Sequence, residues 1–134
     1  MIKSNLARIF TIAALFVLSI FAHVALAGEI KPYGQAEFNK LVAEGKPILL
    51  DIRADWCPTC AAQAPVIQEL MAQSKYKDVT TFTIDFDKDT ALLKAYNVTS
   101  QSTLIVMTGK QEVGRSVGDT RRDDIEQLLS SAVH

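Results

Sequence analysis

From residue 28 onward, the hydrophobic and polar positions follow two alternating patterns. Apolar residues recur every three or four positions in some segments, which predicts amphipathic helices. The helices are expected at 35–44, 59–75 and 91–96, and after residue 120. Between them, short runs rich in apolar, β-branched and aromatic residues predict strands. The strands are expected at 29–33, 48–52, 79–86, 103–107 and 111–117.

The order of these elements predicts the architecture. Strands that alternate with helices form a sheet with a parallel part and place helices on both of its faces. A turn at 108–110 separates the last two strands, so these two are expected to pair as an antiparallel hairpin. We therefore expect an α/β fold with a mixed central sheet, formed by one domain at residues 28–134.

The first 27 residues have a different composition from the rest. They contain Lys3 and Arg8 but none of the 15 acidic residues, and an uncharged apolar run at 9–22 precedes Ala25-Leu26-Ala27. This order is that of a secretory signal peptide cut after Ala27. An uncleaved membrane anchor is the alternative, because the apolar stretch is nearly long enough to span a bilayer. We expect a periplasmic domain, or one anchored in the inner membrane and facing the periplasm.

Charge and cysteine content exclude several classes of function. The formal net charge is −1, which gives no basic surface for nucleic acid. The chain has two cysteines and two histidines, His23 and His134, which do not cluster with them. A zinc site of four thiolates therefore cannot form within one chain. We expect neither a metal nor an organic cofactor.

Cys57 and Cys60 delimit a Cys-Pro-Thr-Cys segment between a buried strand and a helix. If the helix begins near Cys57, the sulfur of this residue faces unpaired backbone N–H groups and the positive end of the helix dipole. Both favour the thiolate, which is the nucleophile of disulfide exchange. Cys60 lies one turn further along the helix, where it can attack a mixed disulfide at Cys57. This arrangement predicts a redox-active disulfide.

Three other interpretations of the two cysteines stay open at this point. They can be buried core thiols, although a Trp-Cys-Pro turn is unusual in a core. They can contribute to a zinc site that a second chain completes. They can also form a permanent structural disulfide, although a loop this short gives little stabilisation through chain entropy.

Further residues around the cysteine pair resemble the thioredoxin family from about residue 30 to residue 129. Ala54-Asp55-Trp56 leads into Cys57 as in that family, and the resemblance extends to five other places in the chain. These are Asp51 in the preceding strand, Pro65 in the following helix, Ile84-Asp85 at the end of a strand, Tyr96-Asn97-Val98, and Gly118 before the last helix. The resemblance implies a thioredoxin fold, in which a C-terminal antiparallel hairpin completes the mixed sheet.

The resemblance also implies roles for individual residues. Cys57 would attack the substrate disulfide, Cys60 would resolve the mixed disulfide, and Asp51 would accept the proton of Cys60. An acid within an apolar run is costly to bury in its charged form, so the pKa of Asp51 is expected to rise unless the residue is a solvated strand end. The substrate-binding surface would consist of Trp56, Pro58, Thr59, Ser102 and Thr103.

This chain departs from the family at the position of a cis-proline that faces the two cysteines. Here the residue is Ser102, and a cis bond before a non-proline residue is costly, so we expect a trans or strained bond. The Ser102 hydroxyl can hydrogen-bond Cys57, or the small side chain can leave room for a metal or an iron–sulfur cluster shared by two chains.

Two further departures concern charge and hydrogen bonding. Thr81 replaces a lysine that many cytosolic members carry, which removes a positive charge near Asp51 and leaves the pKa of that acid higher. Thr59 stands where ordinary thioredoxins have proline, and its N–H adds a donor near the sulfur. We therefore expect a reduction potential higher than that of a thioredoxin with Gly-Pro between its cysteines.

These observations together predict an exported thiol–disulfide oxidoreductase. Its partners would be proteins that offer a disulfide or a dithiol, and a membrane thiol reductase would supply electrons if the role is reductive. No nucleic acid is expected as a partner, and the membrane is one only if the N-terminal segment is uncleaved. The alternative is a non-catalytic binding module of the same fold, with a metal or iron–sulfur cluster between two chains as one possibility.

Overall fold

The computed structural model describes residues 26–133, so nearly all of the expected signal peptide at 1–27 lies outside the described residues. The described chain forms five strands and four α-helices, with one short 3₁₀ helix. The elements in chain order are β1 (Glu29–Pro32), α2 (Gln35–Ala43), β2 (Pro47–Arg53), α3 (Pro58–Met71), η2 (Ser74–Tyr76), β3 (Thr80–Asp85), α4 (Thr90–Ala95), β4 (Thr103–Thr108), β5 (Gln111–Val117) and α5 (Arg122–Ser130).

The five strands form one mixed sheet in the order β1-β3-β2-β4-β5. β1 and β2 both run parallel to β3, whereas β4 pairs antiparallel with β2 and with β5. β2 is the central strand of the sheet. Its residues from Ile48 to Ile52 are buried, as expected for a strand that is covered on both faces. The α/β fold with a C-terminal antiparallel hairpin, expected from the sequence, is confirmed.

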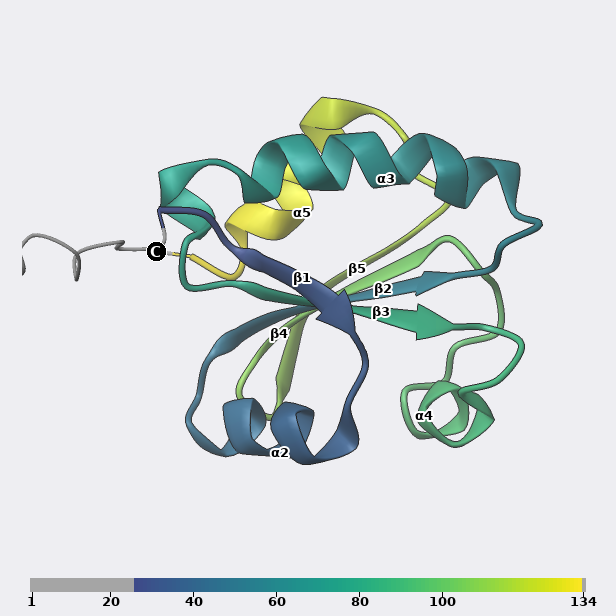
Figure 1. Ribbon diagram of the computed structural model, residues 1–134, viewed down its shortest axis with the longest axis horizontal. Coiled ribbons are helices and arrows are strands. Elements are labelled where there is room, and N and C mark those ends of the chain that lie inside the picture. The colour runs from purple at the N-terminus through teal and green to yellow at the C-terminus, as the bar shows by residue number, and fades with distance from the viewer. Residues whose placement is uncertain (1–25, 134) are drawn as a thin grey trace, which may run out of the picture.

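Helices cover both faces of the sheet (Figure 1). α3 and α5 lie on one face, where Ile67 and Ile125 pack with Leu49, and α2 and α4 lie on the other, where Phe38 and Leu92 join a second cluster. Alternate residues of β2 therefore pack into the core layers on opposite faces of the sheet. Within residues 26–133, none of the helices combines the length and the apolar character needed to cross a membrane.

The helix expected at 59–75 is shorter than its sequence pattern indicates. α3 ends at Met71 and is followed by the 3₁₀ turn η2, which brings Tyr76 into the core. The hydroxyl of Tyr76 lies 3.2 Å from Oγ of Ser130 in α5. Burial of this ring explains the break in the helix, because a continuous helix would not deliver the ring to the same place.

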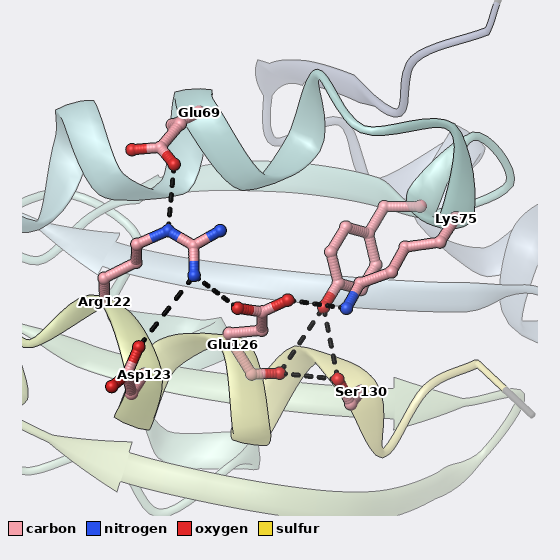
Figure 2. Close-up of polar contacts among 7 residues, drawn as sticks. Glu69, Lys75, Arg122, Asp123, Glu126 and Ser130 are labelled. Atoms are coloured by element: carbon pink, nitrogen blue, oxygen red, sulfur yellow. Dashed lines mark hydrogen bonds and ion pairs between the residues drawn. The ribbon is translucent and has the colours of Figure 1, made fainter.

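A set of charged side chains ties α5 to α3 and η2 (Figure 2). Arg122 donates from Nε to Oε1 of Glu69 at 2.9 Å and from Nη1 to Oε2 of Glu126 at 2.5 Å. Nζ of Lys75 donates to the other carboxylate oxygen of Glu126 at 2.6 Å. Lys75 and Arg122 both hold the pKa of Glu126 below its ordinary value. One carboxylate thus joins cations from two elements.

Substituting Arg122 by glutamine is expected to lower stability slightly, and only at low salt. Exposed ion pairs are weak and are screened as ionic strength rises. Urea unfolding at low and high salt measures the effect. Arg121→Gln is the matched control, because Arg121 pairs with Asp124 three residues further along the chain and does not connect two elements. An equal loss of stability at both salt concentrations would contradict an electrostatic role for Arg122.

Candidate redox-active site

Cys57 occupies the N-cap of α3, directly after the turn that follows β2. Its Sγ accepts a hydrogen bond from the backbone N–H of Cys60 at 3.1 Å, and Pro58 follows as the first helical residue. Proline suits this position because the N–H that it lacks has no partner within a helix. The sulfur of Cys57 therefore lies at the positive end of the helix dipole, where negative charge is stabilised.

A disulfide joins Cys57 to Cys60, with their Cα atoms 5.3 Å apart. Both cysteines are buried and pack with Ala54 and the partly buried Phe86. The two sulfur atoms expected to exchange electrons are thus brought together at the beginning of one helix. This arrangement can form a mixed disulfide at one sulfur and release it by attack of the other.

Ser102 lies against the disulfide, in the loop before β4. Its Oγ is 3.1 Å from Sγ of Cys57 and 3.2 Å from Sγ of Cys60. The bond between Gln101 and Ser102 is trans, and Ser102 has a φ of 61°, in the left-handed region. Both the contact with Cys57 and a trans bond in a strained segment agree with the expectations from the sequence.

The five residues expected to bind substrate divide into two groups. Trp56 is 58% exposed and Pro58 is also exposed, while Thr59 is half-buried. Ser102 and Thr103 are buried, and Thr103 pairs with Ile52 and Val117 within the sheet. Trp56 and Pro58 thus lie on the surface next to the disulfide, whereas Ser102 touches it from inside. Substrate binding by all five stays a prediction.

Trp56 does not belong to the core. Its indole Nε1 donates a hydrogen bond to Oδ2 of Asp87 at 2.8 Å, in the turn after β3. This bond fixes the polar edge of the ring while more than half of the side chain faces solvent. The residue preceding the disulfide therefore offers an apolar surface of defined orientation.

Asp51 is 4% exposed, in the middle of β2. Burial raises the pKa of this carboxyl to about 6, and the charge of Arg53 opposes the rise. Nη1 of Arg53 lies 3.8 Å from Oδ2 of Asp51. A carboxyl of this kind changes its protonation state near neutral pH, as a proton acceptor in the reaction must.

Arg53 was missed by the sequence reasoning, which considered only the lysine that Thr81 replaces. Thr81 is fully buried, and its Oγ1 has no hydrogen-bond partner within residues 26–133. The positive charge near Asp51 comes instead from two residues further along β2. Since residues i and i+2 of a strand share a face, this spacing was a signal that the sequence contained.

Thr59 does not supply the additional donor that its N–H was expected to add. Among the hydrogen bonds of residues 26–133, those at Sγ of Cys57 involve the N–H of Cys60 and the hydroxyl of Ser102. The additional donor thus comes from the loop before β4 and not from the segment between the cysteines.

Gln63 is a second residue that the sequence reasoning missed. It is completely buried in α3, and its Nε2 donates to the carbonyl oxygens of Ser102 at 3.3 Å and of Asp119 at 2.8 Å. Gln63, Ile67 and Leu70 recur at the spacing of one helix face, so a polar residue on an apolar stripe was the available signal. Gln63 joins α3 to the loop before β4, which carries Ser102, and to the segment after β5.

The residues described here offer no group of three or more histidine, cysteine and acidic side chains that could hold a metal ion. A metal or cluster between two chains would need ligands from both of them. The geometry within this chain is that of a dithiol pair with a buried carboxyl and a buried hydroxyl.

Comparison with known proteins gives a consistent result. The family model described as Thioredoxin matches residues 29–131. The thioredoxin of Chlamydia trachomatis is 33% identical over 101 residues, which cover 75% of this chain and 96% of the relative. A Thioredoxin H-type protein of Brassica campestris is 33% identical over 94 residues, which cover 68% of this chain and 75% of the relative.

Solved structures agree with these relatives. The crystal structure of Trxlp from Edwardsiella tarda has a TM-score of 0.73 and 39% identity, and the match covers 75% of this chain and 98% of that one. Thioredoxin NaTrxh from Nicotiana alata has a TM-score of 0.69 and 27% identity, covering 81% of this chain and 94% of that one. Each match spans nearly the full length of the solved structure.

Proposed function

Because this chain belongs to the thioredoxin family and is a thiol–disulfide oxidoreductase, we propose that it acts in an exported compartment on disulfides of protein substrates. The observation that carries the reaction is the disulfide between Cys57 and Cys60 at the beginning of α3. Support for export comes from the order of charged, apolar and small residues at 1–27. Trp56, exposed beside the disulfide, offers a surface for a protein chain.

The reaction proceeds in two exchange steps, starting from the reduced dithiol. The thiolate of Cys57 attacks a substrate disulfide, forms a mixed disulfide, and expels one substrate sulfur as a thiolate. The thiol of Cys60 then loses its proton, and its sulfur attacks Sγ of Cys57. The second substrate sulfur leaves, and two electrons have passed to the substrate. The same steps in reverse oxidise a substrate dithiol.

In this proposal, Asp51 takes the proton of Cys60, directly or through one water molecule. Its pKa of about 6 leaves it ionised, and so able to accept a proton, at neutral pH. The electron pairs come from thiols alone, so the reaction needs no organic cofactor. If the chain acts as a reductant in an oxidising compartment, a membrane thiol reductase must return it to the dithiol.

Export of the full-length chain can be tested by expression in a Gram-negative bacterium and fractionation. The expected result is a periplasmic protein whose mass corresponds to a chain that begins at Gly28, because the small residues at 25 and 27 fit a signal peptidase. Ala27→Leu should block the cleavage and retain the intact chain in the membrane fraction.

An intact wild-type chain in the membrane fraction, digested by protease added from the periplasmic side, would support the anchored form of the same proposal. An intact chain in the cytosolic fraction would contradict export. Neither result bears on the exchange chemistry of Cys57, which is measured separately on purified protein.

A further inference from the structure

We propose that Ser102 is a further catalytic residue of the exchange reaction, and that Gln63 positions it. The Ser102 hydroxyl serves as a hydrogen-bond donor to whichever of the two sulfurs carries negative charge. This proposal rests on thiol–disulfide exchange at Cys57 and not on export, so a failure of the fractionation experiment leaves it intact.

The direction of the hydrogen bond follows from the chemistry of the two partners. In the disulfide, neither Cys57 nor Cys60 has a hydrogen to give, so the Ser102 hydroxyl must be the donor at 3.1 and 3.2 Å. Ser102 is 4% exposed, and its Oγ has no other hydrogen-bond partner among the described residues. The hydroxyl hydrogen is therefore directed at sulfur.

The backbone at Ser102 is held in a conformation that proline cannot adopt. Proline has a φ near −65°, whereas Ser102 has a φ of 61°. The N–H of Ser102 donates to the carbonyl oxygen of Ile52 at 2.9 Å, and its own carbonyl oxygen accepts from the N–H of Gly118 at 2.9 Å. Strain that persists because neighbouring elements hold it in place is a feature of functional sites.

Gln63 completes this support from the side of the helix. Its Nε2 donates one hydrogen bond to the carbonyl oxygen of Ser102 and another to the carbonyl oxygen of Asp119. A buried polar atom costs free energy unless it is hydrogen-bonded, and within residues 26–133 both hydrogen bonds of Gln63 are made by Nε2, whereas its buried Oε1 has no partner. Gln63 thereby fixes Ser102 relative to α3, the helix that carries both cysteines.

The hydroxyl matters more in the reduced state than in the disulfide. A thiolate is a charged acceptor and forms a stronger hydrogen bond than a neutral disulfide sulfur does. Donation to the Cys57 thiolate therefore stabilises the dithiol form and raises the reduction potential. After attack, the same hydroxyl lies within reach of Cys60 as its sulfur gains negative charge in the resolving step.

The experiment compares wild type with Ser102→Ala and Ser102→Gly, purified from the cell fraction in which each accumulates. Redox equilibration against glutathione gives the potential, and the ultraviolet absorbance of the thiolate gives the titration of Cys57. Loss of a hydrogen bond to a charged group should change the dithiol–disulfide equilibrium roughly tenfold, which lowers the potential by about 30 mV. Cys57 should also titrate at higher pH.

Alanine keeps the Cβ of Ser102 and therefore its backbone strain, so Ser102→Ala removes the hydroxyl alone. Glycine adopts a positive φ without strain, so Ser102→Gly shows what relief of that strain adds. Equal shifts in both variants support donation by the hydroxyl. An unchanged potential and titration in Ser102→Ala would overturn the proposal, and a shift in Ser102→Gly alone would assign the effect to backbone strain.

Gln63→Met tests the positioning role with a side chain of similar size. It should shift the potential in the same direction as Ser102→Ala, and it should add nothing when combined with that substitution. Additive shifts in the double variant would show that Gln63 acts independently of Ser102 and would overturn its assignment.

Discussion

Replacing Cys57 by serine is expected to abolish the reduction of a protein disulfide, such as those of insulin, by this chain. A serine hydroxyl is not ionised at neutral pH, so the backbone N–H of Cys60 and the end of the α3 dipole have no thiolate to stabilise. The loss should be at least roughly 10³-fold, as is typical when a nucleophile is removed. Turbidity of reduced insulin, followed with a thiol reductant present, measures it.

Cys60→Ser is the matched variant, because it keeps the attacking sulfur and removes only the resolving one. It should react once and then accumulate as a mixed disulfide with its substrate, visible as a larger species on non-reducing gels. Both variants lose the same disulfide, whose short loop contributes about 2 kcal/mol through chain entropy. Equal activity of wild type and Cys57→Ser would favour a non-catalytic binding module.

The central strands could be predicted because burial on both faces requires a continuous run of apolar residues. β2 is buried on both faces, so its apolar run needs no knowledge of its neighbours to be recognised. Gly45 likewise ends α2 with a φ of 71°, as a glycine following a helix does. Local patterns and backbone chemistry together determine these positions.

The side-chain caps that the sequence suggests for the last two helices do not form. The last helix was expected after residue 120, and α5 begins at Arg122 with Arg121 as its N-cap and no capping side chain. Asp89 is at the N-cap of α4, yet its carboxylate accepts the N–H of Asp85 at 2.8 Å. Neither helix is therefore capped by the side chain of its N-cap residue, although Asp89 stands at the N-cap position that the sequence indicates.

The residues of the site also differ in how far the sequence alone could indicate them. Cys57, Cys60 and Asp51 could be proposed from spacing and resemblance, because each lies at a fixed position relative to β2 and α3. The contacts of Gln63 depend on tertiary structure, whereas the position of Arg53 follows from its spacing of two residues from Asp51 along β2. Gln63 reaches two loops far away in sequence, and the charge of Arg53, on the same strand, lowers the pKa of Asp51 against the rise that burial causes.

Replacing Asp51 by asparagine is expected to stabilise the oxidised protein at pH 8, by up to about 3 kcal/mol. Burial raises the pKa of Asp51 from 3.8 to about 6, so the folded chain holds this proton more tightly than the unfolded chain does. Wild-type stability should therefore fall as the pH rises from 3.8 through about 6, and the full penalty should be present above that. Urea unfolding across this range measures the difference.

The same variant should be a slower enzyme at neutral pH, because an amide cannot accept the proton of Cys60. Removing a general base costs roughly 10²-fold, so mixed disulfide should accumulate during turnover. Arg53→Gln is the matched control: it keeps the carboxyl but removes the cation that lowers the pKa of Asp51. Its fall in stability should extend to higher pH than in wild type. If Asp51→Asn keeps the pH dependence of wild type, ionisation of this buried carboxyl is not its cause.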